Sequence, residues 1–239
     1  MINMKRRLAN PVASLLAMFL TAAVMTFDAF PAFADEKQET TQLVEKARFT
    51  LENFMTDSNM GPVRDLIRRA RGVFIAPQVV RGAFVFGLSG GSGIFLVRDE
   101  RTRNWEGPAF YTVGGLSFGL QIGAQASEVI LLVMTERGVS SFLASNVKLG
   151  ADAGIAAGPV GIGAAAASAN LSADILSFSR SEGLYGGISL EGAVVKTRGD
   201  WNDLYYDRRV TATDILVRHD VRNPQADKLI SVLTQASGK

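Results

Sequence analysis

The chain has 239 residues, with 25 basic and 23 acidic side chains, one histidine and no cysteine. The lack of cysteine excludes disulfides, thiol nucleophiles and cysteine-ligated zinc, and a single histidine leaves mainly carboxylates as metal ligands. We therefore expect no metal, no cofactor and no catalytic residue. The near balance of charges predicts that any basic surface is local, so no nucleic-acid partner is expected.

The first 34 residues have the pattern of a secretory signal peptide. Basic residues at 5–7 precede an apolar run over 12–27, and Ala-Phe-Ala at 32–34 provides the small residues of a cleavage site. The apolar run is shorter than the roughly 20 residues of a membrane-spanning helix, which disfavours an uncleaved anchor. We predict cleavage after Ala34, export to the periplasm, and one domain over residues 35–239. Removing the leader's three basic residues and one acidic residue leaves 22 of each sign.

Two helices are predicted at the start of this domain. Residues 39–55 place apolar side chains at helical spacing with charges between them. A shorter helix begins at Pro62, a favoured first-turn residue, and ends near Ala70. Its apolar residues fall on one side and its arginines on another, so this helix is amphipathic.

Strand-forming residues interrupted by glycine follow over residues 72–123. Strands are predicted at 72–76, 83–86, 94–97, 110–113, 118–122 and 129–134. Glycine weakens an ordinary strand, so repeated glycine inside strands predicts bulges, tight bends or close approach of another surface. The run LSGGSG over residues 88–93 is predicted to be a hairpin connection.

The second half of the chain mixes short strands and helices. Residues 153–173 are uncharged and rich in alanine and glycine; Pro159 and their weak apolarity disfavour a membrane span and predict paired short strands or a small-residue helix against the sheet. Further strands are predicted at 174–179 and 185–190, and helices at 136–145, 213–218 and 224–235. Together these elements predict an α+β fold, in which a glycine-rich antiparallel β-sheet, curled toward a barrel, is covered by N-terminal helices and a C-terminal helix.

One motif matches a catalytic pattern. Residues 87–91 (GLSGG) fit the G-x-S-x-G nucleophile elbow, which needs a strand before the serine and a helix after it. Residues 94–97 predict a strand where the helix is needed, and His219, the one histidine, lies in a polar run. We interpret the motif as a hairpin tip and not as a hydrolase site. Asp152 and Asp174 stand alone in apolar surroundings, and their spacing predicts no metal site.

The strongest binding signal is a cluster of arginines on the second helix. Four arginines fall within eight residues: Arg64, Arg68, Arg69 and Arg71. Guanidinium groups are planar donors that suit phosphate oxygens, and apolar neighbours on the same helix suit a lipid headgroup boundary. The alternative interpretation is a solvated helix face that Asp65 partly neutralises.

Seven sequence blocks follow one another along almost the whole domain: ARGVFIAP (70–77), GLSGGSG (87–93), WEGPAF (105–110), GLQIGAQ (119–125), LGAD (149–152), GPVG (158–161) and SFSRSEGLYGGISLEG (177–192). Together these blocks resemble the SYLF-domain family of lipid-binding proteins, some of whose eukaryotic members also bind actin filaments. The resemblance extends over roughly residues 40–235.

The resemblance implies binding of anionic phospholipid headgroups, which are phosphoinositides in eukaryotic members, through a basic amphipathic region near the start of the domain. Here that region corresponds to Arg64, Arg68, Arg69 and Arg71. In a periplasmic protein we expect phosphatidylglycerol, cardiolipin or lipopolysaccharide phosphates as partners, and we do not expect actin. The sequence therefore predicts non-enzymatic, peripheral binding to an anionic phospholipid membrane surface. The alternative hypothesis is a structural or protein-interaction module of the envelope.

Overall fold

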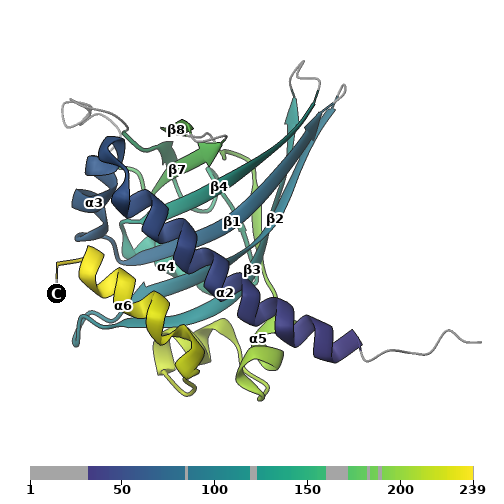
Figure 1. The fold of residues 1–239 in the computed structure, drawn as a ribbon, viewed down its shortest axis with the longest axis vertical. Helices are drawn as coiled ribbons and strands as arrows, with labels where there is room; N and C mark the ends of the chain where they lie inside the picture. The colour runs from purple at the N-terminus through teal and green to yellow at the C-terminus, as the bar shows by residue number, and fades with distance from the viewer. Residues whose placement is uncertain are drawn as a thin grey trace, which may run out of the picture. The chain divides into compact units, whose positions relative to one another are not determined.

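The first described helix, α2 (Ala32–Thr56), crosses one face of a β-sheet in the computed structural model (Figure 1). Its buried residues Leu43, Ala47, Leu51 and Phe54 recur every three or four positions, which directs one stripe of the helix toward the sheet. The prediction of a helix over residues 39–55 is confirmed, and α2 extends beyond it at both ends. Residues Phe33–Lys239 form one compact unit, and the structure describes residues 32–83, 86–118, 123–159, 172–181, 184–187 and 190–238.

Shorter helices follow α2 and close the chain. They are η1 (Ser58–Met60), α3 (Gly61–Ile67), α4 (Glu136–Leu143), α5 (Gly199–Tyr206), η4 (Asp214–Arg218), η5 (Pro224–Ala226) and α6 (Asp227–Ala236). The predicted helix from Pro62 is confirmed as α3, although it ends at Ile67, whereas α5 is not anticipated by the sequence pattern. Within the described residues, none of these helices combines the length and apolarity that a membrane crossing requires.

Nine strands in the described residues form one curled sheet (Figure 1). They are β1 (Gly72–Ala83), β2 (Phe86–Arg98), β3 (Trp105–Phe118), β4 (Gly123–Val133), β5 (Asn146–Lys148), β6 (Ile155–Ala157), β7 (Ile175–Ser181), β8 (Leu184–Gly187) and β9 (Val194–Thr197). Their order is β5-β9-β3-β2-β1-β4-β7-β6, and β8 pairs with β7. Neighbours are antiparallel except β6 and β7, which are parallel. The predicted α+β fold with a curled antiparallel sheet is therefore confirmed.

The sheet separates two apolar cores. Along β1, Val73 and Ile75 belong to one core, whereas Phe74 and Ala76 belong to the other, because side chains alternate between the two faces of a strand. The first core also contains buried residues of α2, α3, α5 and α6. The second contains Phe142 of α4 and buried residues of η4. The helices from both ends of the chain therefore pack on the same face of the sheet.

The glycine-rich run at residues 88–93 departs from its prediction. A hairpin connection there is wrong, because these residues lie inside β2 and pair with β1 on one side and β3 on the other. The facing strand β1 carries Pro77 at an irregularity in its register with both neighbours, the place where a central strand tolerates proline. Beside it, the carbonyl oxygen of Gln78 comes so close to Gly91 that a Cβ there would lie 2.2 Å from it. Glycine at this position thus permits close approach of two strands.

Other strands are longer than the glycine pattern predicts. The predicted strands at 72–76 and 83–86 are the two ends of a region that β1 and the start of β2 occupy, with residues 84 and 85 outside the described chain. The predicted strand at 118–122 begins where β3 ends, and its remaining residues are not described. In the alanine- and glycine-rich stretch, β6 is a short paired strand as expected, and residues 160–171 lie outside the described residues.

Candidate functional site

The arginine cluster begins on α3, which follows α2 after the short helix η1. Pro62 stands in the first turn of α3, and Val63, Leu66 and Ile67 are buried against the core. The guanidinium of Arg64 does not face solvent freely: its Nη1 donates to the carbonyl oxygens of Met55 at 3.0 Å and Asp57 at 2.7 Å. Carbonyls at the end of a helix lack partners within the helix. Arg64 therefore ties the end of α2 to α3.

Arg71 lies between α3 and β1, and its guanidinium also has protein partners. Its Nη1 forms ion pairs with Glu100 and, at 3.2 Å, with Glu136, while 40% of the side chain remains exposed. Exposed ion pairs contribute little to stability, but these two carboxylates compete with any external phosphate for the same donors. Arg71, like Arg64, is therefore not a freely available cation.

Arg68 and Arg69 follow the last turn of α3 and are exposed. In the described part of the chain, neither guanidinium has an ion pair or a side-chain hydrogen bond. The structure therefore brings all four predicted arginines to one short segment but gives them different roles. Two are held by the protein, and two adjacent ones are available to a ligand.

A fifth arginine, not singled out by the sequence, lies beneath this segment. Arg98 ends β2 and is buried, with Nη1 donating to the carbonyl oxygen of Arg68 at 2.8 Å and Nε to that of Arg103 at 3.4 Å. Burial lowers the pKa of this guanidinium, and the like charge of Arg103 acts in the same direction. An arginine keeps its charge under such shifts. No pattern in the sequence distinguishes Arg98 from an ordinary charged residue at the end of a strand.

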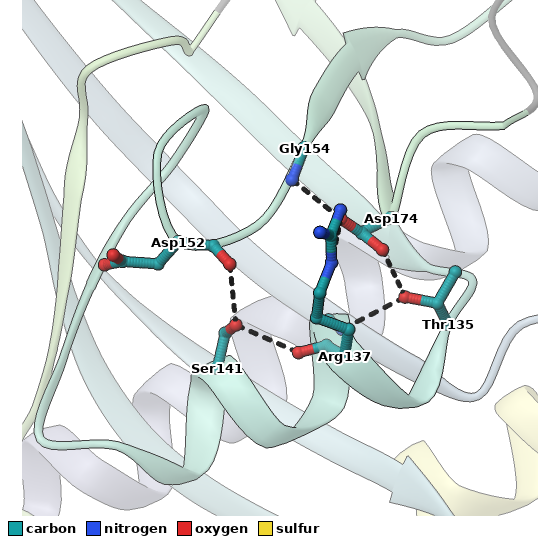
Figure 2. A network of polar contacts seen from close by, with 7 residues as sticks. Thr135, Arg137, Ser141, Asp152, Gly154 and Asp174 are labelled. Carbon is teal, nitrogen blue, oxygen red and sulfur yellow. Dashed lines mark hydrogen bonds and ion pairs between the residues drawn. The ribbon is translucent and has the colours of Figure 1, made fainter.

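A second polar site surrounds Asp174, on the other core (Figure 2). The buried carboxylate of Asp174 accepts hydrogen bonds from Thr135 Oγ1 at 2.6 Å, from Arg137 Nε at 3.0 Å and from the Gly154 amide at 2.8 Å. Thr135 in turn caps the start of α4 by accepting from the Gly138 amide at 3.1 Å. The sequence suggested that Asp174 is isolated, but in the structure it joins α4, β6 and β7.

This network indicates that Asp174 has a structural and not a chemical role. Burial raises the pKa of the carboxyl, but the hydrogen bonds from Arg137, Thr135 and the Gly154 amide outweigh burial, so the pKa lies below its usual value. The carboxylate is accordingly charged at neutral pH and saturated with donors. In the described residues, no group of three or more histidine, cysteine, aspartate or glutamate side chains is arranged to hold a metal ion.

The nucleophile-like motif has no hydrolase geometry. Ser89 lies inside β2, which continues to Arg98, so a strand stands where the elbow needs a helix. Its hydroxyl donates to the carbonyl oxygen of Gly115 at 3.2 Å. His219 caps the end of η4, and its Nε2 lies 4.0 Å from Asp99. The interpretation of the motif as non-catalytic agrees with this arrangement, although Ser89 is not at a hairpin tip.

A groove runs between α2 and the bulge in β1. It consists of two adjoining hollows of about 430 and 360 Å³ that share Lys46, Pro77 and Gln78. Charges of both signs line it, with Lys46 and Arg180 beside Glu39 and Glu128, so the groove does not select an anion. The aromatic residues Trp105, Phe110 and Tyr111 do not line this groove, because they are buried in the two cores.

The chain matches a known family over the second half of this fold. The family model Ysc84, described as Las17-binding protein actin regulator, matches residues 114–236. The chain is 32% identical over 176 residues to SH3 domain-containing YSC84-like protein 1 of Bos taurus and 31% identical over 176 residues to the Homo sapiens protein of the same name. It is 30% identical over 173 residues to LAS seventeen-binding protein 3 of Saccharomyces cerevisiae. The chain therefore belongs to the Ysc84 family, the family of SYLF domains.

These matches cover most of this chain but only part of each relative. They include 73%, 73% and 71% of the chain, against 51%, 51% and 37% of the three relatives. The chain thus spans about half the length of the mammalian relatives and less of the yeast one. Family members carry names that describe binding and regulation: Las17 binding and actin regulation.

Proposed function

We propose that this chain binds anionic phospholipid surfaces peripherally, without catalysing a reaction, through the segment that ends α3. The observation that supports this function is the pair Arg68 and Arg69, adjacent, exposed and without ion pairs in the described residues. Arginine side chains donate in a planar fork that matches phosphate oxygens. Arg64 contributes by tying the end of α2 to α3, whereas Glu100 and Glu136 share the guanidinium of Arg71.

The expected affinity is modest and sensitive to salt. Each arginine near an anionic bilayer contributes about 1 kcal/mol, so Arg68 and Arg69 together contribute about 2 kcal/mol, or about 30-fold in the partition coefficient. Screening shortens from about 10 Å at 0.1 M salt to about 3 Å at 1 M. Binding by this segment alone therefore weakens strongly when salt is raised.

We place this activity at the periplasmic side of a bacterial envelope. The basic, apolar and small-residue pattern of residues 1–34 supports export. Phosphatidylglycerol and cardiolipin then supply the anionic headgroups, with lipopolysaccharide phosphates as a further source. No protein partner is needed for this function.

Flotation with lipid vesicles tests the proposal. We expect the protein to float with vesicles of phosphatidylcholine mixed with phosphatidylglycerol and not with phosphatidylcholine alone. The double variant Arg68→Gln/Arg69→Gln should lose about 30-fold in partition coefficient. Equal binding to neutral and anionic vesicles, or equal binding of this variant and the wild type, contradicts the proposal.

The chain offers a matched control for this variant. Arg208 and Arg209 form a second exposed pair of adjacent arginines without ion pairs in the described residues. They follow α5 and stand next to Asp207, which pairs with Lys37 near the start of α2 at 2.5 Å. Along α2, Lys37 lies about 28 Å from Thr56, which is the end of the helix close to α3. The variant Arg208→Gln/Arg209→Gln removes the same charge at a distant place and should bind like the wild type.

The alternative function is a protein-interaction module of the envelope. The description of the family as a Las17-binding actin regulator favours a protein partner. Under this function the wild type and Arg68→Gln/Arg69→Gln behave alike toward vesicles. Pelleting with purified actin filaments tests the partner that the family description names, and flotation on anionic vesicles that Arg68→Gln/Arg69→Gln abolishes rejects this alternative in favour of lipid binding.

A further inference from the structure

We propose that the turn between β2 and β3, residues 99–104, supplies the second half of this anion-binding surface through Arg101 and Arg103. The partner is the phosphate layer of an anionic bilayer, met by two arginines from each of two chain segments. This inference rests on the proposed function and extends it to a segment about thirty positions further along the sequence.

Arg98 places the two segments together. Its guanidinium donates both to the carbonyl oxygen of Arg68, at the end of α3, and to that of Arg103, in the turn. The main chain adds a further link, because the Arg98 amide donates to the carbonyl oxygen of Arg71 at 2.8 Å. The main chains at Arg68 and Arg103 are therefore neighbours across one buried guanidinium, and Arg98 is a positioning residue for the surface.

The turn holds a fixed conformation before any ligand arrives. The Asp99 carboxylate accepts from the Thr102 amide at 2.6 Å and from the Arg101 amide at 3.1 Å. The main chain closes the turn through hydrogen bonds from Arg103 to Asp99 at 2.9 Å and from Asp99 to Asn104 at 2.8 Å. A preorganised turn loses little conformational freedom on binding, so its charges act at their full strength.

The acidic residues of the turn are already engaged, whereas its arginines are not. Asp99 holds the turn and lies 4.0 Å from His219, and Glu100 pairs with Arg71. Arg101 and Arg103 are exposed and have no ion pair in the described residues. Over the segments 64–71 and 98–103 together there are seven arginines and three carboxylates. This local excess contrasts with the even balance of residues 35–239.

The distribution of these charges identifies the class of ligand. Four exposed guanidinium groups lie on the two segments, and the hollow that Arg71, Arg98 and Glu100 line within the described residues includes none of the four. Such an array suits many phosphates spread over a plane, as in a bilayer, better than one free phosphate. The occupant we infer is therefore the membrane surface itself.

The test removes the turn arginines and leaves α3 unchanged. Arg101→Gln/Arg103→Gln should lose about 30-fold in partition coefficient on phosphatidylcholine–phosphatidylglycerol vesicles, as Arg68→Gln/Arg69→Gln does, and the four substitutions together should lose about a thousandfold. Wild-type binding by the turn variant while the α3 variant fails overturns this inference and leaves the proposed function in place. Failure of the wild type to float on these vesicles overturns both.

Two further arms make the outcome decisive. Arg103 adopts a left-handed backbone with φ of 61°, which glycine accepts readily, so Arg101→Gln/Arg103→Gly removes the charges without disturbing the turn. Its melting temperature should equal that of the wild type. In competition, inorganic phosphate should displace the protein no better than sodium chloride of equal ionic strength. Stronger displacement by phosphate indicates a discrete phosphate site and contradicts an array.

Discussion

The substitution Asp174→Asn tests whether the charge of one buried carboxylate holds α4, β6 and β7 together. Only 6% of the Asp174 side chain is exposed, and it accepts from Thr135, Arg137 and the Gly154 amide. A hydrogen bond to a charged group contributes about 1.5–3 kcal/mol. Arg137 is 71% exposed, so solvent screens its share, and asparagine retains one acceptor oxygen. We therefore expect the free energy of unfolding to fall by about 2–3 kcal/mol at pH 7.

The effect should depend on pH in one direction. The folded-state pKa of Asp174 lies below its usual value, so the carboxylate contributes stability above the unfolded pKa of about 3.9. That contribution disappears as pH falls from about 4 through the folded-state pKa. The wild type loses it on acidification, whereas asparagine does not titrate. The difference between the two proteins should therefore be full at pH 7 and smaller at pH 3.

Urea unfolding followed by the fluorescence of the buried residues Trp105 and Trp201 measures this difference. Asp152→Asn is the matched control, because Asp152 is exposed and, among the described residues, its carboxylate accepts from the Lys148 amide alone, at 2.7 Å. We expect the control to cost about 1 kcal/mol or less. Equal losses in both variants, or a difference at pH 3 as large as at pH 7, refute the assignment of stability to the Asp174 charge.

Two further predictions follow from the strands and the N-terminus. Gly91→Ala places a Cβ 2.2 Å from the Gln78 carbonyl oxygen and should lower the free energy of unfolding by about 1–3 kcal/mol, whereas the neighbouring Gly90→Ala meets its nearest atom only at 3.9 Å and should change it by less than about 0.5 kcal/mol. Equal melting temperatures of these two variants contradict the close approach of β1 and β2. Expressed in a Gram-negative host, the protein should be recovered from the periplasm with Asp35 as its first residue by mass spectrometry, and recovery of the uncleaved chain in the cytoplasm contradicts the predicted signal.

Elements with a clear periodicity could be read from the sequence. The spacing of Leu43, Leu51 and Phe54 predicts α2 because every turn of the helix repeats the same contact with the sheet. By contrast, β5 and β9 have three and four residues, too few for any period to emerge. Their pairing depends on the free edge of β3, which no local pattern reveals.

The glycines of residues 88–93 are ambiguous in the sequence, because both a turn and the close approach of two strands require glycine. In residues 88–93 it reads as a connection, since glycine is common in turns. The actual reason at Gly91 is the carbonyl of Gln78 on the neighbouring strand. Gln78 lies more than ten residues earlier in the chain, beside Pro77 at the irregularity in β1, so the local sequence around Gly91 does not reveal this contact.

The candidate site was predictable as a segment but not residue by residue. Arg64 and Arg68 have the same side chain on the same short region. Partners elsewhere decide which one is available: the carbonyl of Met55 holds Arg64, and Glu136 approaches Arg71 from another helix. Arg98, which joins the segment to the turn, gives no signal in the sequence because its role depends on two main-chain oxygens.

Because β9 (Val194–Thr197) lies late in the sequence, part of one edge of β3 stays unpaired until most of the chain is present. β3 pairs with β2 along one side, and residues 111–114 of its other side pair with residues 194–197. An unpaired edge of a sheet recruits other chains as readily as its own. A nascent or truncated chain that stops before Val194 therefore leaves residues 111–114 of β3 without their strand partner, and this part of the edge can pair with another chain.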